Sequence, residues 1–89
     1  MSVNCPGCSG LFRRVPLVLR FTTSLADGFN ENSTNTYYCE RCKNWFERYD
    51  CYGYDGRLEW RDEDDLMKAN NMRRNAKYLY FTEYKEATK

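Results

Sequence analysis

The chain has 89 residues, of which 42 % are hydrophobic, 30 % charged and 17 % aromatic. This composition is typical of one small soluble domain and excludes a disordered tail, and the longest apolar run, residues 15–19, is too short to span a membrane. The net charge is +1, whereas proteins that bind duplex nucleic acid mainly through phosphates carry a clear basic excess. The charge balance therefore favours a protein partner.

The first half of the chain contains one cysteine pair and one predicted strand. Cys5 and Cys8 enclose Pro-Gly, and the glycine helps a tight turn to form. Residues 15–23 are rich in apolar and β-branched side chains and predict a strand, with Pro16 at its start or on an edge. Residues 24–36 include Asp-Gly and three Asn, a composition that predicts a loop.

A second cysteine pair, Cys39 and Cys42, precedes a predicted β-hairpin. Residues 45–52 predict its first strand, residues 53–56 a turn, and residues 57–60 the returning strand. The fifth cysteine, Cys51, lies on this hairpin, where we expect it to act as a partly buried small hydrophobic residue.

The composition changes at Asp62, which is the predicted N-cap of a helix over residues 62–77. Three acidic residues follow in the first turn, where they favour the positive end of the helix. Residues 78–84 fit either an extension of the helix or a short strand. One apolar stripe recurs at spacings of three and four and consists of Leu66, Ala69, Met72, Ala76 and Leu79.

The two cysteine pairs predict a metal site. Two residues between cysteines allow one turn to direct both sulfurs at one ion, and four thiolates suit tetrahedral zinc. We therefore expect one structural Zn²⁺ on Cys5, Cys8, Cys39 and Cys42. Two disulfides, a redox-active pair or an iron site are the alternatives. Because residue 5 leaves no room for an export signal before it, we expect an intracellular protein whose thiols stay reduced.

The same cysteines argue against catalysis. Four thiolates fill the coordination shell of the metal and leave no position for water. The chain contains no histidine, which is the commonest general base and the partner of most Ser or Cys nucleophiles. We therefore expect a protein that is not an enzyme.

Residues 5–60 resemble a zinc ribbon, in which two metal-binding turns alternate with strands. The second turn is also similar to the ribbons of S-type transcription elongation factors and small RNA polymerase subunits, through Thr36, Tyr37, Tyr38, Cys39, Cys42 and Trp45. Those elongation factors carry an Ala-Asp-Glu tip directed at the polymerase's catalytic metal. Here Ala26 and Asp27 match, but Gly28 takes the place of Glu, so the resemblance does not extend to transcript cleavage. Small bacteriophage transcription activators with four-cysteine zinc sites are similar in size.

The predicted hairpin is dense in aromatic and arginine side chains. Alternation along a strand places rings on both of its faces, so these residues either fill a core, contact a protein or stack on single-stranded nucleic acid. The predicted partner-binding residues are Trp45, Arg48, Tyr52, Tyr54, Arg57 and Trp60.

The sequence thus predicts a small zinc-stabilised, β-rich domain. We expect a zinc ribbon over residues 1–61 and a C-terminal helix and tail over residues 62–89. The expected function is that of a non-enzymatic module that docks on a transcription complex or another nucleic-acid machine, with RNA polymerase or a large assembly as partner and no membrane contact. A structural or adaptor subunit of a viral particle and a single-strand-binding protein are the alternatives.

Overall fold

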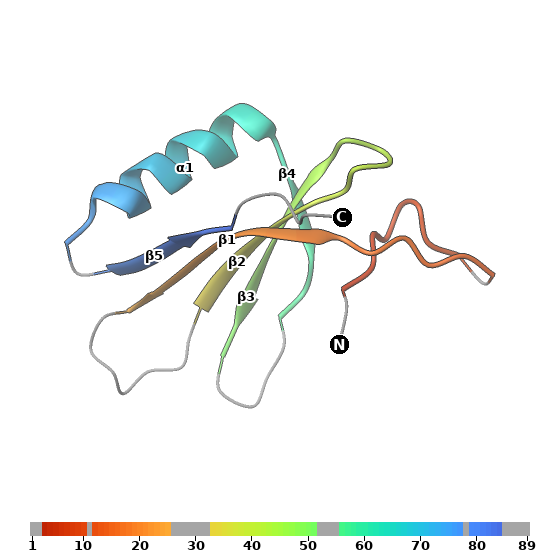
Figure 1. Ribbon diagram of the computed structural model, residues 1–89, viewed down its shortest axis with the longest axis horizontal. Helices are drawn as coiled ribbons and strands as arrows, with labels where there is room; N and C mark the ends of the chain where they lie inside the picture. The colour runs from red at the N-terminus through yellow and green to blue at the C-terminus, as the bar shows by residue number, and fades with distance from the viewer. Residues whose placement is uncertain (1–2, 11, 26–32, 52–55, 78, 85–89) are drawn as a thin grey trace.

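The computed structural model describes residues 3–10, 12–25, 33–51, 56–77 and 79–84. Five strands form one antiparallel sheet in the order β4-β3-β2-β1-β5, and the helix α1 covers one face of this sheet (Figure 1). The elements in chain order are β1 (Val18–Leu25), β2 (Ser33–Tyr38), β3 (Trp45–Asp50), β4 (Glu59–Arg61), α1 (Glu63–Asn75) and β5 (Leu79–Glu83). The predicted β-rich fold with a helix is confirmed at this level.

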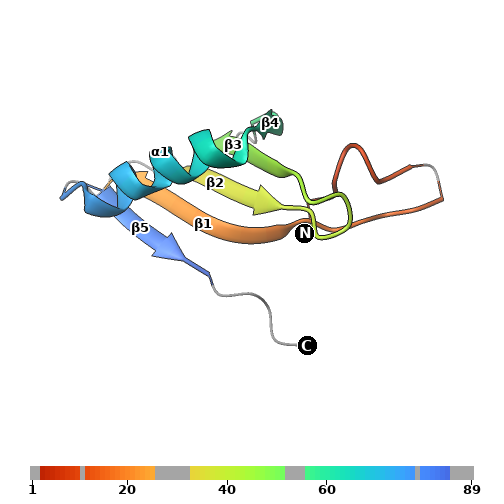
Figure 2. The same cartoon turned by 90° about the horizontal axis from the view of Figure 1, so that it is seen from above.

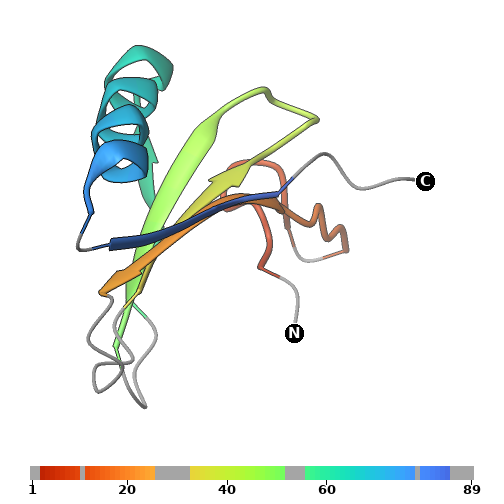
Figure 3. The same ribbon diagram turned by 60° about the vertical axis from the view of Figure 1, so that its left-hand side comes forward.

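The segment before β1 lies on the sheet face opposite to α1 (Figure 3). We call these two faces the helix side and the knuckle side. The N-terminal segment also extends beyond the ends of the strands, at the same end of the molecule as the connection between β2 and β3 (Figure 2). The sheet therefore separates two different surroundings.

The strand β1 contributes to both faces because its register shifts. Leu19 pairs with Tyr37 and Phe21 with Thr36, so Arg20 is an extra residue in this strand. A bulge of this kind changes which face the following side chains occupy. Leu17 and Leu19 therefore pack on the knuckle side, whereas Phe21 packs on the helix side.

Each face of the sheet has its own small core. On the helix side, Phe21 lies between two aromatic rings, with centroid distances of 6.4 Å to Trp45 and 5.6 Å to Phe81, and Leu66 of α1 covers this cluster. The buried residues of the knuckle side are Cys5, Leu17, Tyr37, Cys39 and Phe46. Two of these five residues are cysteines, so the predicted metal ligands are part of a hydrophobic core.

The central strand β2 begins at Ser33, although the composition of residues 33–36 predicts a loop. Its polar side chains find partners on the neighbouring strands. Asn35 accepts a hydrogen bond from Thr22 (2.9 Å) and donates one to Asp50 (2.7 Å). Residues 24 and 25 of the predicted loop belong to β1, and residues 26–32 lie outside the described residues. Pairing on both sides therefore stabilises a strand that local propensity does not favour.

The β3–β4 hairpin is confirmed, since Glu47 pairs with Glu59 and Trp45 with Arg61. Of the predicted turn, only Gly56 is described. A Cβ atom at this position would lie 1.9 Å from the carbonyl oxygen of Tyr49, so the two backbone segments approach each other too closely for any other residue.

The helix begins as predicted, because the Asp62 side chain accepts hydrogen bonds from the backbone of Asp64 and Asp65. The predicted stripe is partly wrong: Met72 is 75 % exposed, whereas Asn70 is buried. Of the ambiguous residues beyond the helix, Leu79–Glu83 form the strand β5, which pairs with β1. Among the described residues, no helix is long and apolar enough to cross a membrane.

Leu66 is 2 % exposed and is the buried apolar anchor of α1. We expect Leu66→Ala to lower the free energy of unfolding by about 2–5 kcal/mol, because it leaves a cavity over Phe21 and Trp45. Urea denaturation measures this change. The exposed control Met72→Ala should stay within about 0.5 kcal/mol of wild type. Equal unfolding midpoints for the two variants would contradict the packing described here.

Candidate metal centre

Two backbone turns of the same design present the four cysteines. In the first, the amide of Ser9 donates to the carbonyl of Cys5 (3.0 Å), and in the second the amide of Lys43 donates to the carbonyl of Cys39 (2.8 Å). The amides of Cys5 and Cys39 are also bound, to the carbonyls of Val15 (2.8 Å) and Asn44 (2.9 Å). Each pair of sulfurs is therefore held by a closed, hydrogen-bonded turn.

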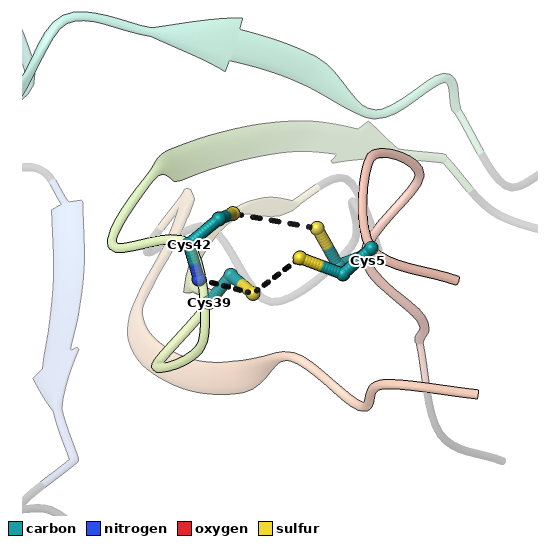
Figure 4. Close-up of side chains that lie close together, drawn as sticks. Cys5, Cys39 and Cys42 are labelled. Carbon is teal, nitrogen blue, oxygen red and sulfur yellow. Dashed lines mark hydrogen bonds between the residues drawn. The ribbon is translucent and has the colours of Figure 1, made fainter. Parts of the chain in front are cut away.

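The four sulfurs converge from these turns, which are far apart in sequence (Figure 4). Cys5 Sγ lies 3.8 Å from Cys42 Sγ, and Cys8 Sγ lies 3.8 Å from Cys39 Sγ. All four sulfur atoms lie within 4.8 Å of one another. A regular tetrahedron with Zn–S bonds of about 2.3 Å has sulfur–sulfur edges of about 3.8 Å. The cluster therefore has the dimensions of a tetrahedral metal site and can hold one ion, and none of these cysteines is in a disulfide.

Neighbouring groups support the sulfurs from outside. The backbone amide of Cys42 donates to Cys39 Sγ (3.5 Å), and the side-chain amide of Asn44 donates to Cys42 Sγ (3.4 Å). Asn44 in turn accepts a hydrogen bond from the indole of Trp60 (3.4 Å). Such second-layer bonds orient metal ligands and stabilise thiolates. Trp60 is thereby coupled to the cysteine cluster.

The thiols differ in proton affinity. Burial raises the pKa of Cys8 to about 12, and hydrogen bonds with Cys42 and Cys39 act in the same direction. Burial also raises the pKa of Cys42. Hydrogen bonds from the Cys39 and Cys8 thiols and from the Asn44 backbone outweigh this effect and lower the pKa of Cys42 to about 7. Cys42 is thus a thiolate at lower pH than Cys8. A metal ion must displace the remaining protons, so its affinity falls as pH falls.

The predicted partner-binding residues do not form one surface. Trp45 is in the core, 9 % exposed, because its ring packs between Phe21 and Tyr38 under the helix. Arg48 faces the knuckle side, where it pairs with Asp50 (2.8 Å) and lies over the ring of Tyr37. Arg57 and Trp60 are exposed, the latter by 58 %. Tyr52 and Tyr54 lie outside the described residues.

The structure also shows exposed side chains outside the predicted partner-binding set. Tyr49, which is half exposed, lines a hollow of about 390 Å³ on the helix side. Phe12 protrudes next to the first cysteine turn. In the sequence, Phe12 is a large apolar residue between Gly10 and Arg13 that belongs to no periodic apolar pattern, and this was the signal available for its exposure. The residues that line the hollow are Thr34, Glu47, Tyr49, Gly56, Arg57, Glu59, Arg61 and Arg73.

We found no match to the chain among protein-family models, curated proteins or solved structures. The cysteine geometry is compatible with a zinc-ribbon-like site, and the interpretation of the site rests on that geometry.

We expect Cys39→Ser to lose the metal and to lower the melting temperature sharply, because the change removes a buried ligand from the knuckle-side core. Native mass spectrometry measures the metal content, and circular dichroism follows melting. The control Cys51→Ser should keep the metal, since Cys51 is not part of the cluster. Equal metal content in both variants would contradict the site.

Lys43 has a φ of 60°, the left-handed conformation that costs most residues energy. We expect Lys43→Gly to be at least as stable as wild type, and Lys43→Val to be less stable by about 1–2 kcal/mol. Urea denaturation of the two variants provides the test. A valine variant as stable as the glycine variant would show that the turn adopts a different conformation.

Proposed function

We propose that the chain is a non-enzymatic, intracellular binding module of the zinc-ribbon type that docks on a nucleic-acid machine, with a transcription complex as the foremost example. The single observation that carries this proposal is the convergence of four sulfurs with the spacing of a tetrahedral site. Thiolate ligands select zinc and iron–sulfur chemistry, and a closed four-sulfur tetrahedron suits a structural Zn²⁺. The metal then serves to hold the fold together.

The arrangement of the ligands supports a binding role over catalysis. Zn²⁺ on four thiolates has no open position for a substrate or water. The chain also has no histidine to act as a general base. What remains for function is the surface that the metal helps to form.

The hollow on the helix side has the chemistry of a protein-contact surface. It contains three arginines and two glutamates around the half-exposed ring of Tyr49. Glu47 fixes two of the arginines, because its carboxylate lies 3.3 Å from Arg61 Nε and 2.9 Å from Arg73 Nη1. Arginine and tyrosine side chains dominate protein hot spots, and charges of both signs suit a protein better than a polyanion. We therefore assign the docking contact to this hollow.

The proposal predicts retention of RNA polymerase, purified from the source organism, on the immobilised zinc-loaded chain. Tyr49→Ala and Arg57→Ala should each weaken retention by about tenfold or more, as expected for loss of a hot-spot side chain. Lys68→Ala, which removes an exposed charge from α1, is the matched control and should bind as wild type.

Melting curves and metal content of the same samples separate binding from folding. Failure of the folded, zinc-loaded chain to retain polymerase would remove the transcription complex as partner. A chain without bound metal would overturn the zinc-ribbon assignment.

A further inference from the structure

The ring of Phe12 is 97 % exposed, the largest value among the large hydrophobic side chains that the structure describes. It belongs to the N-terminal segment that projects from the end of the sheet (Figure 1). An isolated exposed aliphatic residue is ordinary, but an aromatic ring that contacts almost nothing leaves a large apolar face to water. Such a ring is available for stacking on a ligand.

Exposed cations lie in the same segment as Phe12 and at the same end of the molecule. Arg13 and Arg14 follow Phe12 directly, and Arg41 and Lys43 lie on the second cysteine turn, at the same end of the molecule (Figure 2). Glu40 is the one exposed acidic residue of the two turns. The four positive charges exceed the negative ones in number. The negative charges are that of Glu40 and the formal charge of −2 that four thiolates and one Zn²⁺ would carry. The acidic first turn of α1 lies across the sheet, on the helix side (Figure 3).

A second exposed ring lies on the knuckle side. Trp60 pairs with Phe46, whose side chain belongs to the knuckle-side core, so Trp60 points to the same side of the sheet. More than half of its surface is exposed. Its hydrogen bond to Asn44 links it to the second cysteine turn. The ring is thus fixed in orientation while its surface remains available.

We propose that the zinc end of the chain, formed by Phe12, Arg13, Arg14, Arg41, Lys43 and Trp60, binds single-stranded nucleic acid. The bases stack on the two rings, and the cations contact the phosphates. Duplex nucleic acid hides the faces of its bases, so it cannot use exposed rings in this way. The predominance of positive charge distinguishes this surface from the mixed charges of the helix-side hollow and fits a polyanion. A net charge of +1 for the chain is compatible with this role because the charges are segregated.

This inference rests on the proposed function in one respect, since the metal holds the two cysteine turns together. It goes further in that it assigns the knuckle side to a nucleic-acid strand and leaves the helix side to a protein. The two surfaces lie on opposite faces of the sheet and are altered by different substitutions.

The test is fluorescence anisotropy of the full zinc-loaded chain with labelled oligo(dT) and oligo(rU) of about 15 nucleotides, within the span of known single-strand sites. We expect Phe12→Ala to weaken binding by about tenfold, the order expected for one lost stacking contact. The double variant Arg13→Ala/Arg14→Ala should reduce the slope of log affinity against log salt by about 1.4, which corresponds to two lost phosphate contacts.

Matched controls come from the helix. Met72→Ala removes an exposed apolar side chain, and Lys68→Ala/Lys77→Ala removes two exposed charges, and both should bind as wild type. An unlabelled duplex should compete poorly.

Wild-type affinity in the Phe12 and arginine variants, or no binding tighter than about 1 mM, would overturn the inference. If the chain then still carries zinc and retains polymerase, the proposed function stands alone. Oligonucleotide binding that depends on Phe12 in a metal-free chain would instead support the inference and contradict the zinc staple.

Discussion

The convergence of four cysteine sulfurs is the interaction on which the knuckle side of the molecule depends. It joins residues 5–8 to the β2–β3 connection across a gap of about thirty residues, and two of the sulfurs are fully buried in the core there. A chain of 89 residues buries little apolar surface, so a metal ion bound at this site would add free energy that packing alone does not supply. The cysteine cluster adjoins the segment that carries Phe12 and the turn that supports Trp60 through Asn44. An ion bound at this site would therefore help to fix both exposed rings.

The extra residue at Arg20 is the second constraint. Without it, Leu17, Leu19 and Phe21 would lie on one face of β1, because side chains alternate along a strand. Because of the bulge, Leu17 and Leu19 pack in the core that contains the cysteines, and Phe21 packs in the core under α1. The extra side chain also interacts with the helix-side core, because the guanidinium of Arg20 lies 5.9 Å from the centre of the Trp45 ring. One strand can therefore serve two small cores.

Features that depend on local chemistry could be predicted from the sequence. The Asp62 cap and the β3–β4 hairpin follow from a few neighbouring residues, and both are present. The two cysteine turns are local as well, whereas their convergence was predicted from the preference of zinc for four sulfur ligands. Features that depend on tertiary contacts could not. The polar residues of β2 form a strand only because both neighbours pair with them. Asn70 replaces Met72 on the buried face because α1 packs along Leu66, Asn70 and Arg73, and Trp45 is buried because this helix covers it.

The sheet separates two cores that are stabilised by different interactions. Its helix side is held by rings, leucine and ion pairs, whereas its knuckle-side core includes the four cysteines of the candidate metal site. These two supports respond to different conditions in a cell. If the site holds zinc, scarcity of zinc or oxidation of thiols would act first on the knuckle side and, through the strands that the two cores share, on the stability of the whole sheet. Folding of such a chain, and with it any binding, would then depend on the supply of the metal.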